Sequence, residues 1–158
     1  MITVVVLAVV LALAAPSFIS IINNNRLAAQ GNELVASLHH ARSEAIRRNA
    51  SITVCNSADG ATCSAAASDW SSWLTVVGSS DEVLRSHSVK APLQISSSAQ
   101  GITFSGDGLA RSATGGLLDA EITVCLPTER PPENRRIVRL ASGSRVSTDS
   151  VDGEGVCP

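Results

Sequence analysis

Four cysteines, three histidines and a group of arginines near the C-terminus are the side chains of this chain that could do chemistry. The chain has 158 residues and a formal net charge of −2. The cysteines form an even set, Cys55, Cys63, Cys125 and Cys157, and all of them follow an apolar N-terminus. An even set of cysteines behind a candidate membrane segment favours oxidation outside the cytoplasm. We therefore expect two disulfides.

Four cysteines can pair in three ways. Joining Cys55 to Cys63 would close a short loop, and joining Cys125 to Cys157 would fasten the C-terminal tail to the body of the domain. We favour this pairing over the crossed ones. A zinc site is disfavoured, because neither pair has the spacing of two to four residues that a zinc knuckle needs.

The arginines near the C-terminus could bind the phosphates of DNA. The candidates are Arg135, Arg136, Arg139 and Arg145, on two adjacent predicted strands and the end of the loop before them, with Arg130 earlier on that loop. Side chains alternate along a strand, so Arg136 and Arg139 should lie on opposite faces, and acidic residues on both sides would offset the attraction. We therefore rank DNA binding below a strand pair that is solvated or contacts another subunit.

The remaining polar residues do not form a catalytic constellation. His39 and His40 are adjacent on a predicted helix and point about 100° apart, so they cannot bind one metal ion together. His87 lies in a predicted strand with no evident partner. The sequence has no Gly-x-Ser-x-Gly elbow and no Gly-Lys-Ser/Thr phosphate loop. We expect a protein that is not an enzyme and binds no cofactor and no metal.

The elements that must position these residues begin with a long helix. Residues 1–22 carry no charge, and as a helix they would be about 33 Å long, close to the thickness of a bilayer core. We predict that this half spans the membrane or forms the core of a filament. Pro16 should kink or divide the helix, and the weak helix formers Asn23, Asn24 and Asn25 favour a bend or local melting.

Residues 23–48 continue the helix with two faces. An apolar stripe recurs at spacings of three, four or seven residues and should pack on a partner surface. Its members are Leu27, Leu34, Leu38, Ala41 and Ala45.

Two other interpretations of the N-terminus remain open. Ala12-Leu13-Ala14 fits the cleavage site of a secretory signal peptide, although no Lys or Arg precedes Arg26 to form its basic n-region. A helix buried inside a soluble protein is disfavoured, because little of the chain is left to enclose a helix that is apolar on every face.

After Asn49 the pattern changes to short runs rich in Ile, Val and Thr, separated by Gly, Ser, Asp and Pro. This predicts an antiparallel sheet over residues 49–158, with Ser105-Gly106-Asp107-Gly108 as a tight hairpin. The predicted strands are 52–55, 73–77, 82–87, 93–96, 102–105, 121–125, 136–140 and 145–147. The fold class is therefore α+β: a long N-terminal helix, membrane-spanning in its first half and amphipathic in its second, packed on an antiparallel head domain.

The run Ala41-Arg42-Ser43-Glu44-Ala45, a following strand that ends in Cys55, the later Ile102-Thr103-Phe104-Ser105 and the penultimate Cys157 together resemble the type IV pilin-like GspH/FimT family. Members of this family include minor pilins of the FimU and FimT type and H-type pseudopilins. The family has a leader that ends in Gly and a mature start of Phe-Thr-Leu-x-Glu type. Neither is present here, so we expect Met1 to lie a few residues inside the mature helix.

The resemblance implies a structural subunit that waits in the bacterial inner membrane with its head in the periplasm and then enters a pilus fibre. Its expected partners are inner-membrane lipid before assembly and other minor and major pilins afterwards. The first expectation is a minor pilin that helps to initiate or cap the type IV pilus. The alternatives are a receptor for double-stranded DNA in natural transformation and an H-type pseudopilin of type II secretion. DNA-receptor members carry Gly-Arg-x-Arg, whereas this chain has Gly143-Ser144-Arg145-Val146.

Overall fold

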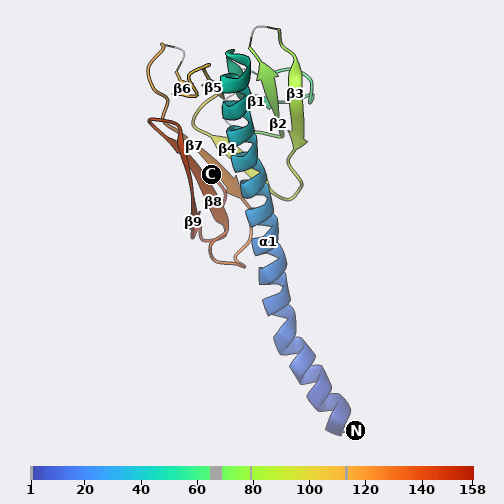
Figure 1. The fold of residues 1–158 in the computed structure, drawn as a ribbon. Coiled ribbons are helices and arrows are strands. Elements are labelled where there is room, and N and C mark those ends of the chain that lie inside the picture. The colour runs from blue at the N-terminus through green and yellow to red at the C-terminus, as the bar shows by residue number, and fades with distance from the viewer. Residues whose placement is uncertain (1, 65–68, 79, 113) are drawn as a thin grey trace.

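A single long helix dominates the computed structural model, which describes residues 2–64, 69–78, 80–112 and 114–158, and the side chains of residues 2 and 4–17 are not described. Helix α1 runs from Ile2 to Arg48. It continues without interruption through Pro16 and Asn23–Asn25, so the expected division or local melting is wrong, although Figure 1 shows the helix curving below the head. We call residues 2–26 of α1 the stem and residues 49–158 the head.

The stem holds most of the apolar stretch that was expected to cross a membrane. The side chains of residues 1, 2 and 4–17 lie outside the described set, and they make up most of that stretch. Within the described residues, no helix combines the length and apolar character needed to cross a membrane.

The helix ends where its sequence favours an end. Asn49 has a positive φ of 48°, a conformation that Asn tolerates and that commonly terminates helices. The Ala50 amide then bonds back to the Ala45 carbonyl at 3.2 Å. Arg47 and Arg48 in the last turn place positive charge at the negative end of the helix dipole.

The strands of the head form two antiparallel sheets. Sheet A has the order β3-β2-β1-β5-β6, and sheet B has the order β4-β7-β8-β9. The bounds of the strands are β1 Ile52–Ser57, β2 Ser72–Val77, β3 Val83–Ser88, β4 Gln94–Ser97, β5 Gly101–Phe104, β6 Ala110–Arg111, β7 Ala120–Cys125, β8 Arg135–Ala141 and β9 Arg145–Val151.

The second half of α1 packs on both sheets. It contacts β1 and β5 of sheet A and β7 and β8 of sheet B. Figure 1 shows it running between the green strands of sheet A and the orange strands of sheet B. One apolar core joins the three layers, with Trp70, Trp73 and Phe104 among its largest fully buried side chains.

The α+β expectation is confirmed, with two differences in the head. All eight predicted strands are present within a few residues, but they divide into two sheets where one was expected. Strand β6, only two residues long, was not predicted. The hairpin at residues 105–108 is confirmed: it connects β5 to β6, and the Gly108 amide bonds to the Ser105 carbonyl at 2.8 Å. Gly108 has a φ of 75°, and a Cβ there would lie 2.8 Å from Cδ1 of Ile46.

Candidate functional site

The second half of α1 meets the head through one fully buried face. The stripe residues Leu27, Leu34, Leu38, Ala41 and Ala45 are each at most 1% exposed. Their spacing puts them on one side of the helix, where they close the core between the two sheets. This half of the helix therefore belongs to the fold of the head.

A polar cluster holds sheet A to this face. The Trp73 indole N–H donates to Oγ of Ser37 at 3.0 Å, and that hydroxyl donates to the Glu33 carbonyl at 2.9 Å. One carboxylate oxygen of Glu33 lies 2.9 Å from Nδ1 of His87 on β3. The His87 ring also stacks on Trp73, with centroids 5.3 Å apart. His87 was expected to have no partner, and that expectation is wrong: its partners lie on α1 and β2.

Sheet B is tied to α1 closer to the stem. The Asn23 side-chain amide donates to the Arg130 carbonyl at 2.8 Å. The guanidinium of Arg136 donates to Oδ1 of Asn24 and to the Glu133 carbonyl, and the Arg136 residue is only 8% exposed. Two of the asparagines that were expected to weaken the helix therefore bond to the head.

The arginines considered for DNA binding do not form one free basic face. Arg135 donates to the carbonyl of Val156 at 2.8 and 3.1 Å, which holds the C-terminal tail. Arg139 forms ion pairs of 2.6 Å with carboxylates on β7 and β9. Arg136 is buried against α1, and Arg145 is exposed with no hydrogen bond or ion pair to the described residues. Three of the four side chains thus already form hydrogen bonds or ion pairs with other residues of the same chain.

The disulfides take the pairing that the sequence favoured. Cys55 bonds to Cys63, with 5.6 Å between their Cα atoms, and holds the loop after β1. Cys125 bonds to Cys157, with 5.7 Å between their Cα atoms, and fastens the tail to the end of β7. Each sheet therefore carries one covalent link.

A cluster of charged side chains lies at the C-terminal end of α1, which we call its top. Hydrogen bonds from Arg47 and Arg48 lower the pKa of Glu44 from 4.5 to about 2. Arg48 also reaches Glu82, in the turn between β2 and β3, at 3.2 Å. Burial, with the nearby charge of Arg85 as the second cause, lowers the pKa of His40. No three or more His, Cys, Asp or Glu side chains among the described residues are placed to hold a metal ion.

The stem presents apolar side chains to solvent just below the head. Phe18 is 65% exposed, and Ile19, Ile21 and Ile22 are between 51% and 54% exposed. Such a contiguous run of exposed apolar side chains is typical of an interaction site. The apolar stripe of the helix is therefore buried by the head from Leu27 onward, whereas these four side chains below it are exposed to solvent.

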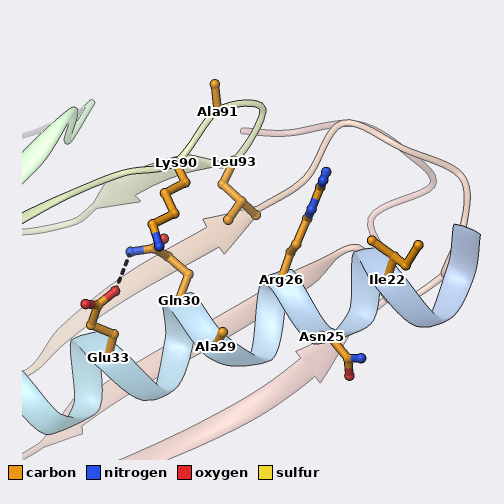
Figure 2. A pocket seen from close by; sticks show the side chains of 9 residues that line it. All are labelled: Ile22, Asn25, Arg26, Ala29, Gln30, Glu33, Lys90, Ala91 and Leu93. Carbon is orange, nitrogen blue, oxygen red and sulfur yellow. Dashed lines mark hydrogen bonds between the residues drawn. The ribbon is translucent and has the colours of Figure 1, made fainter.

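A pocket of about 510 Å³ lies where the stem meets the head. Figure 2 shows Lys90 and Leu93 extending from the segment between β3 and β4 toward α1, with Arg26 rising from the helix beside them. The lining residues are Ile22, Asn25, Arg26, Ala29, Gln30, Glu33, Lys90, Ala91 and Leu93.

Comparison with known proteins identifies the family. The sequence model of the family described as "Type II transport protein GspH" matches residues 30–143, more than half of the chain. The chain belongs to the GspH family.

Solved structures with the same fold include minor pilins and a pseudopilin. Two crystal structures of the type IV minor pilin FimU from Pseudomonas aeruginosa are 20% and 21% identical to this GspH-family chain, with TM-scores of 0.56 and 0.59. The matches cover 78% and 80% of this chain and 92% and 90% of FimU. The minor pseudopilin EpsH from the type 2 secretion system of Vibrio cholerae is 10% identical, with a TM-score of 0.58, over 79% of this chain and 97% of EpsH. No curated protein sequence matches the chain.

Two features of this GspH-family chain were not foreseen from its sequence. The first is the cluster of Glu33, Ser37, Trp73 and His87, whose members come from distant parts of the chain. The second is the pocket, which needs Lys90 to approach α1 from the segment after β3. The only signal in the sequence for the first was polar side chains, Glu33 and Ser37, at helix positions that neighbour the apolar stripe.

Proposed function

We propose that this chain is a non-catalytic minor pilin, a structural subunit that joins related subunits through its stem and helps to initiate or cap a type IV pilus. The observation that carries this proposal is the contrast along α1. The stripe from Leu27 to Ala45 is fully buried in the head, whereas Phe18, Ile19, Ile21 and Ile22 are at least half exposed. A helix that is apolar beyond its own domain needs a second environment.

Lipid and a bundle of similar helices are the two environments that suit the stem. Apolar surface leaving water gains about 25 cal/mol per Å² in either of them, so transfer from one to the other changes the free energy little. We place the stem in the bacterial inner membrane before assembly and among other stems afterwards. The head would then be periplasmic, an oxidising compartment that suits two disulfides.

The test is a charge placed on the stem. The double substitution Ile19→Asp and Ile22→Asp should reduce the amount of the chain in sheared surface filaments at least tenfold. The matched control is Leu117→Asp, which changes an apolar head residue that is 49% exposed and should assemble normally. Immunoblots of the filament and membrane fractions measure both. Normal assembly of the double variant, or a wild-type chain that is freely soluble in the periplasm, would overturn the proposal.

The second candidate is an H-type pseudopilin of type II secretion, which the description of the family model favours. The two roles predict different losses in a strain without the gene. Loss of surface pili with normal secretion supports the pilus role, and normal piliation with a missing secreted protein supports the secretion role.

DNA reception is the weaker alternative, since three of its four candidate arginines are already bonded within the molecule. We expect the full chain in mild detergent to leave the mobility of a DNA duplex unchanged at low salt. A shift that Arg145→Ala abolishes would establish DNA binding instead.

A further inference from the structure

The pocket at the base of the head lies at a defined height above the apolar end of the stem. Ile22 is the last residue of the apolar run, and Arg26 is the first residue with a charged side chain. Four helical residues separate their levels by about 6 Å. The headgroup layer on each side of a bilayer core is about 5–8 Å thick. With the stem in the membrane, as the proposed function has it, Arg26 would lie among the phosphates.

Two cations face this pocket without a protein partner. Neither Arg26 nor Lys90 forms a hydrogen bond or an ion pair with the described residues, and both are exposed. By contrast, Arg47, Arg111 and Arg139 each pair with a carboxylate. The free cations thus include two that line one pocket: Arg26 on α1, nearer to Ile22, and Lys90 on the segment after β3, whose ammonium lies over Gln30 (Figure 2).

The other lining groups suit a lipid rather than a free anion. Ile22, Ala29 and Leu93 give the pocket an apolar floor that continues from the exposed stem. The one carboxylate, Glu33, lies at the far end from Ile22, and its two oxygens are occupied by Gln30 at 3.3 Å and by His87 at 2.9 Å. A ligand that arrives along the stem therefore meets Arg26 before it reaches Glu33, and Lys90 lies farther along, over Gln30 (Figure 2).

We propose that this pocket binds the headgroup of an anionic phospholipid, with Arg26 holding its phosphate, Lys90 adding positive charge at the far end of the headgroup, and the acyl chains lying along the stem. The formal charge of the pocket, two cations against one carboxylate, favours a headgroup with net negative charge over a zwitterionic one. Such a contact would fix the height and rotation of the head at the membrane before assembly. It rests on the membrane location of the stem, which the proposed function supplies.

The experiment uses the full chain in non-ionic detergent, titrated with phosphatidylglycerol or phosphatidylcholine, with lipid adducts counted by native mass spectrometry. Each basic side chain near an anionic lipid surface contributes about 1 kcal/mol, which corresponds to about fivefold in affinity. We expect Arg26→Gln and Lys90→Gln each to weaken phosphatidylglycerol binding about fivefold, and the double variant about 25-fold. Arg26→Lys should keep most of the affinity, and phosphatidylcholine should bind more weakly than phosphatidylglycerol.

The matched control is Arg145→Gln, which removes an exposed arginine at the start of β9 that pairs with none of the residues the structure describes and is far along the chain from the stem. It should leave lipid binding unchanged. Equal binding by the double variant and the wild type, or an equal loss in the control, would overturn the inference. Membrane fractionation of the same proteins separates the two proposals. If all of them stay in the membrane while lipid binding is insensitive to Arg26 and Lys90, only the lipid site fails, whereas a soluble wild type would remove the proposed function itself.

Discussion

Sheets A and B hold the same helix by different means. Sheet A meets α1 at Glu33 and Ser37 through a fully buried tryptophan, Trp73, and the histidine stacked on it. Sheet B shares the apolar core with α1 through β7 and β8, and it also bonds to the stem at Asn23 and Asn24, through Arg130 and Arg136. The side-chain hydrogen bonds to α1 thus involve a buried aromatic residue at the upper position and partly exposed polar residues at the position nearer to the N-terminus.

The difference suggests a division of labour. We call the contact of Glu33 and Ser37 with Trp73 the upper contact, and that of Asn23 and Asn24 with sheet B the lower contact. The upper contact contributes more to the stability of the head, because burial of a large aromatic side chain outweighs a few hydrogen bonds that water could replace. The lower contact sets where the helix leaves the head, since Asn23 lies among the exposed apolar residues of the stem. Substitutions at the upper contact should therefore lower the free energy of unfolding more than substitutions at the lower contact.

The largest effect should come from the Trp73→Ala substitution. It removes a fully buried side chain together with the stack on His87 and the bond to Ser37. We expect the free energy of unfolding to fall by about 3–5 kcal/mol. Denaturant unfolding of the full chain in mild detergent measures it. Trp73→Phe is the control, and it should cost less, about 1–2 kcal/mol, because it keeps an aromatic ring beside His87 but loses the hydrogen bond and leaves a small cavity.

A loss for Trp73→Ala smaller than that of any sheet B substitution would reverse the comparison. The upper contact would then not be the stronger one, and the aromatic cluster would serve mainly to position His87.

For the disulfides the order should be reversed: removal of the one in sheet B should cost more stability than removal of the one in sheet A. Cys125 and Cys157 are 32 residues apart, and Cys55 and Cys63 are 8 apart. The entropy of loop closure predicts losses of about 4 and about 2.5 kcal/mol when each pair is changed to alanine. The same unfolding measurement tests this order. If the short loop proved the costlier loss, strain or local packing rather than chain entropy would dominate.

A smaller effect is expected for Arg136→Met in sheet B. The methionine keeps much of the apolar stem of the arginine but leaves Oδ1 of Asn24 and the Glu133 carbonyl without their donor. Asn24 and Glu133 are exposed, so water can partly replace the lost donor, and we expect a loss of about 1 kcal/mol. Arg145→Met, at an exposed arginine with no partner among the described residues, should stay within about 0.5 kcal/mol of the wild type. Equal losses in the two variants would show that Arg136 contributes only its charge.

The sequence predicted the local features of both sheets and missed what joins them. Short runs rich in Ile, Val and Thr, bounded by Gly, Ser, Asp and Pro, located eight strands, because such runs are local features of the sequence. The sequence could not locate β6, since Ala110 and Arg111 are too few to show a period. It also gave one sheet instead of two, because the pairing of β1 with β5 and of β4 with β7 depends on contacts far apart in the chain.

The same limit explains the errors on α1 and His87. Asn23 and Asn24 are weak helix formers on their own, but their side chains bond to the head, and this tertiary contact outweighs propensity. Glu33 and His87 are separated by 54 positions, so no local pattern links them. The apolar stripe was predictable because its spacing alone defines one face.

The smallest expected effect is a pH dependence confined to the top of α1. The pKa of Glu44 is about 2 in the folded chain against 4.5 for the free side chain, because Arg47 and Arg48 hydrogen-bond its charged form. A lowered folded pKa means that the contribution of Glu44 to stability is complete above about 4.5 and is lost as the pH falls toward 2. An NMR titration of the Glu44 carboxyl in the full chain should show a midpoint at about pH 2.

The consequence for the comparison lies in Arg48. It bonds to both Glu44 and Glu82, so the last turn of α1 and the turn between β2 and β3 share one arginine. Amide signals of Arg47 and Arg48 should shift as Glu44 protonates, and those of Asn23 and Asn24 should not. In Glu44→Gln the last turn of α1 should lose this response. A Glu44 that titrates near 4.5 would mean that solvent screens the pairs, and the top of α1 would then owe its attachment to the buried stripe alone.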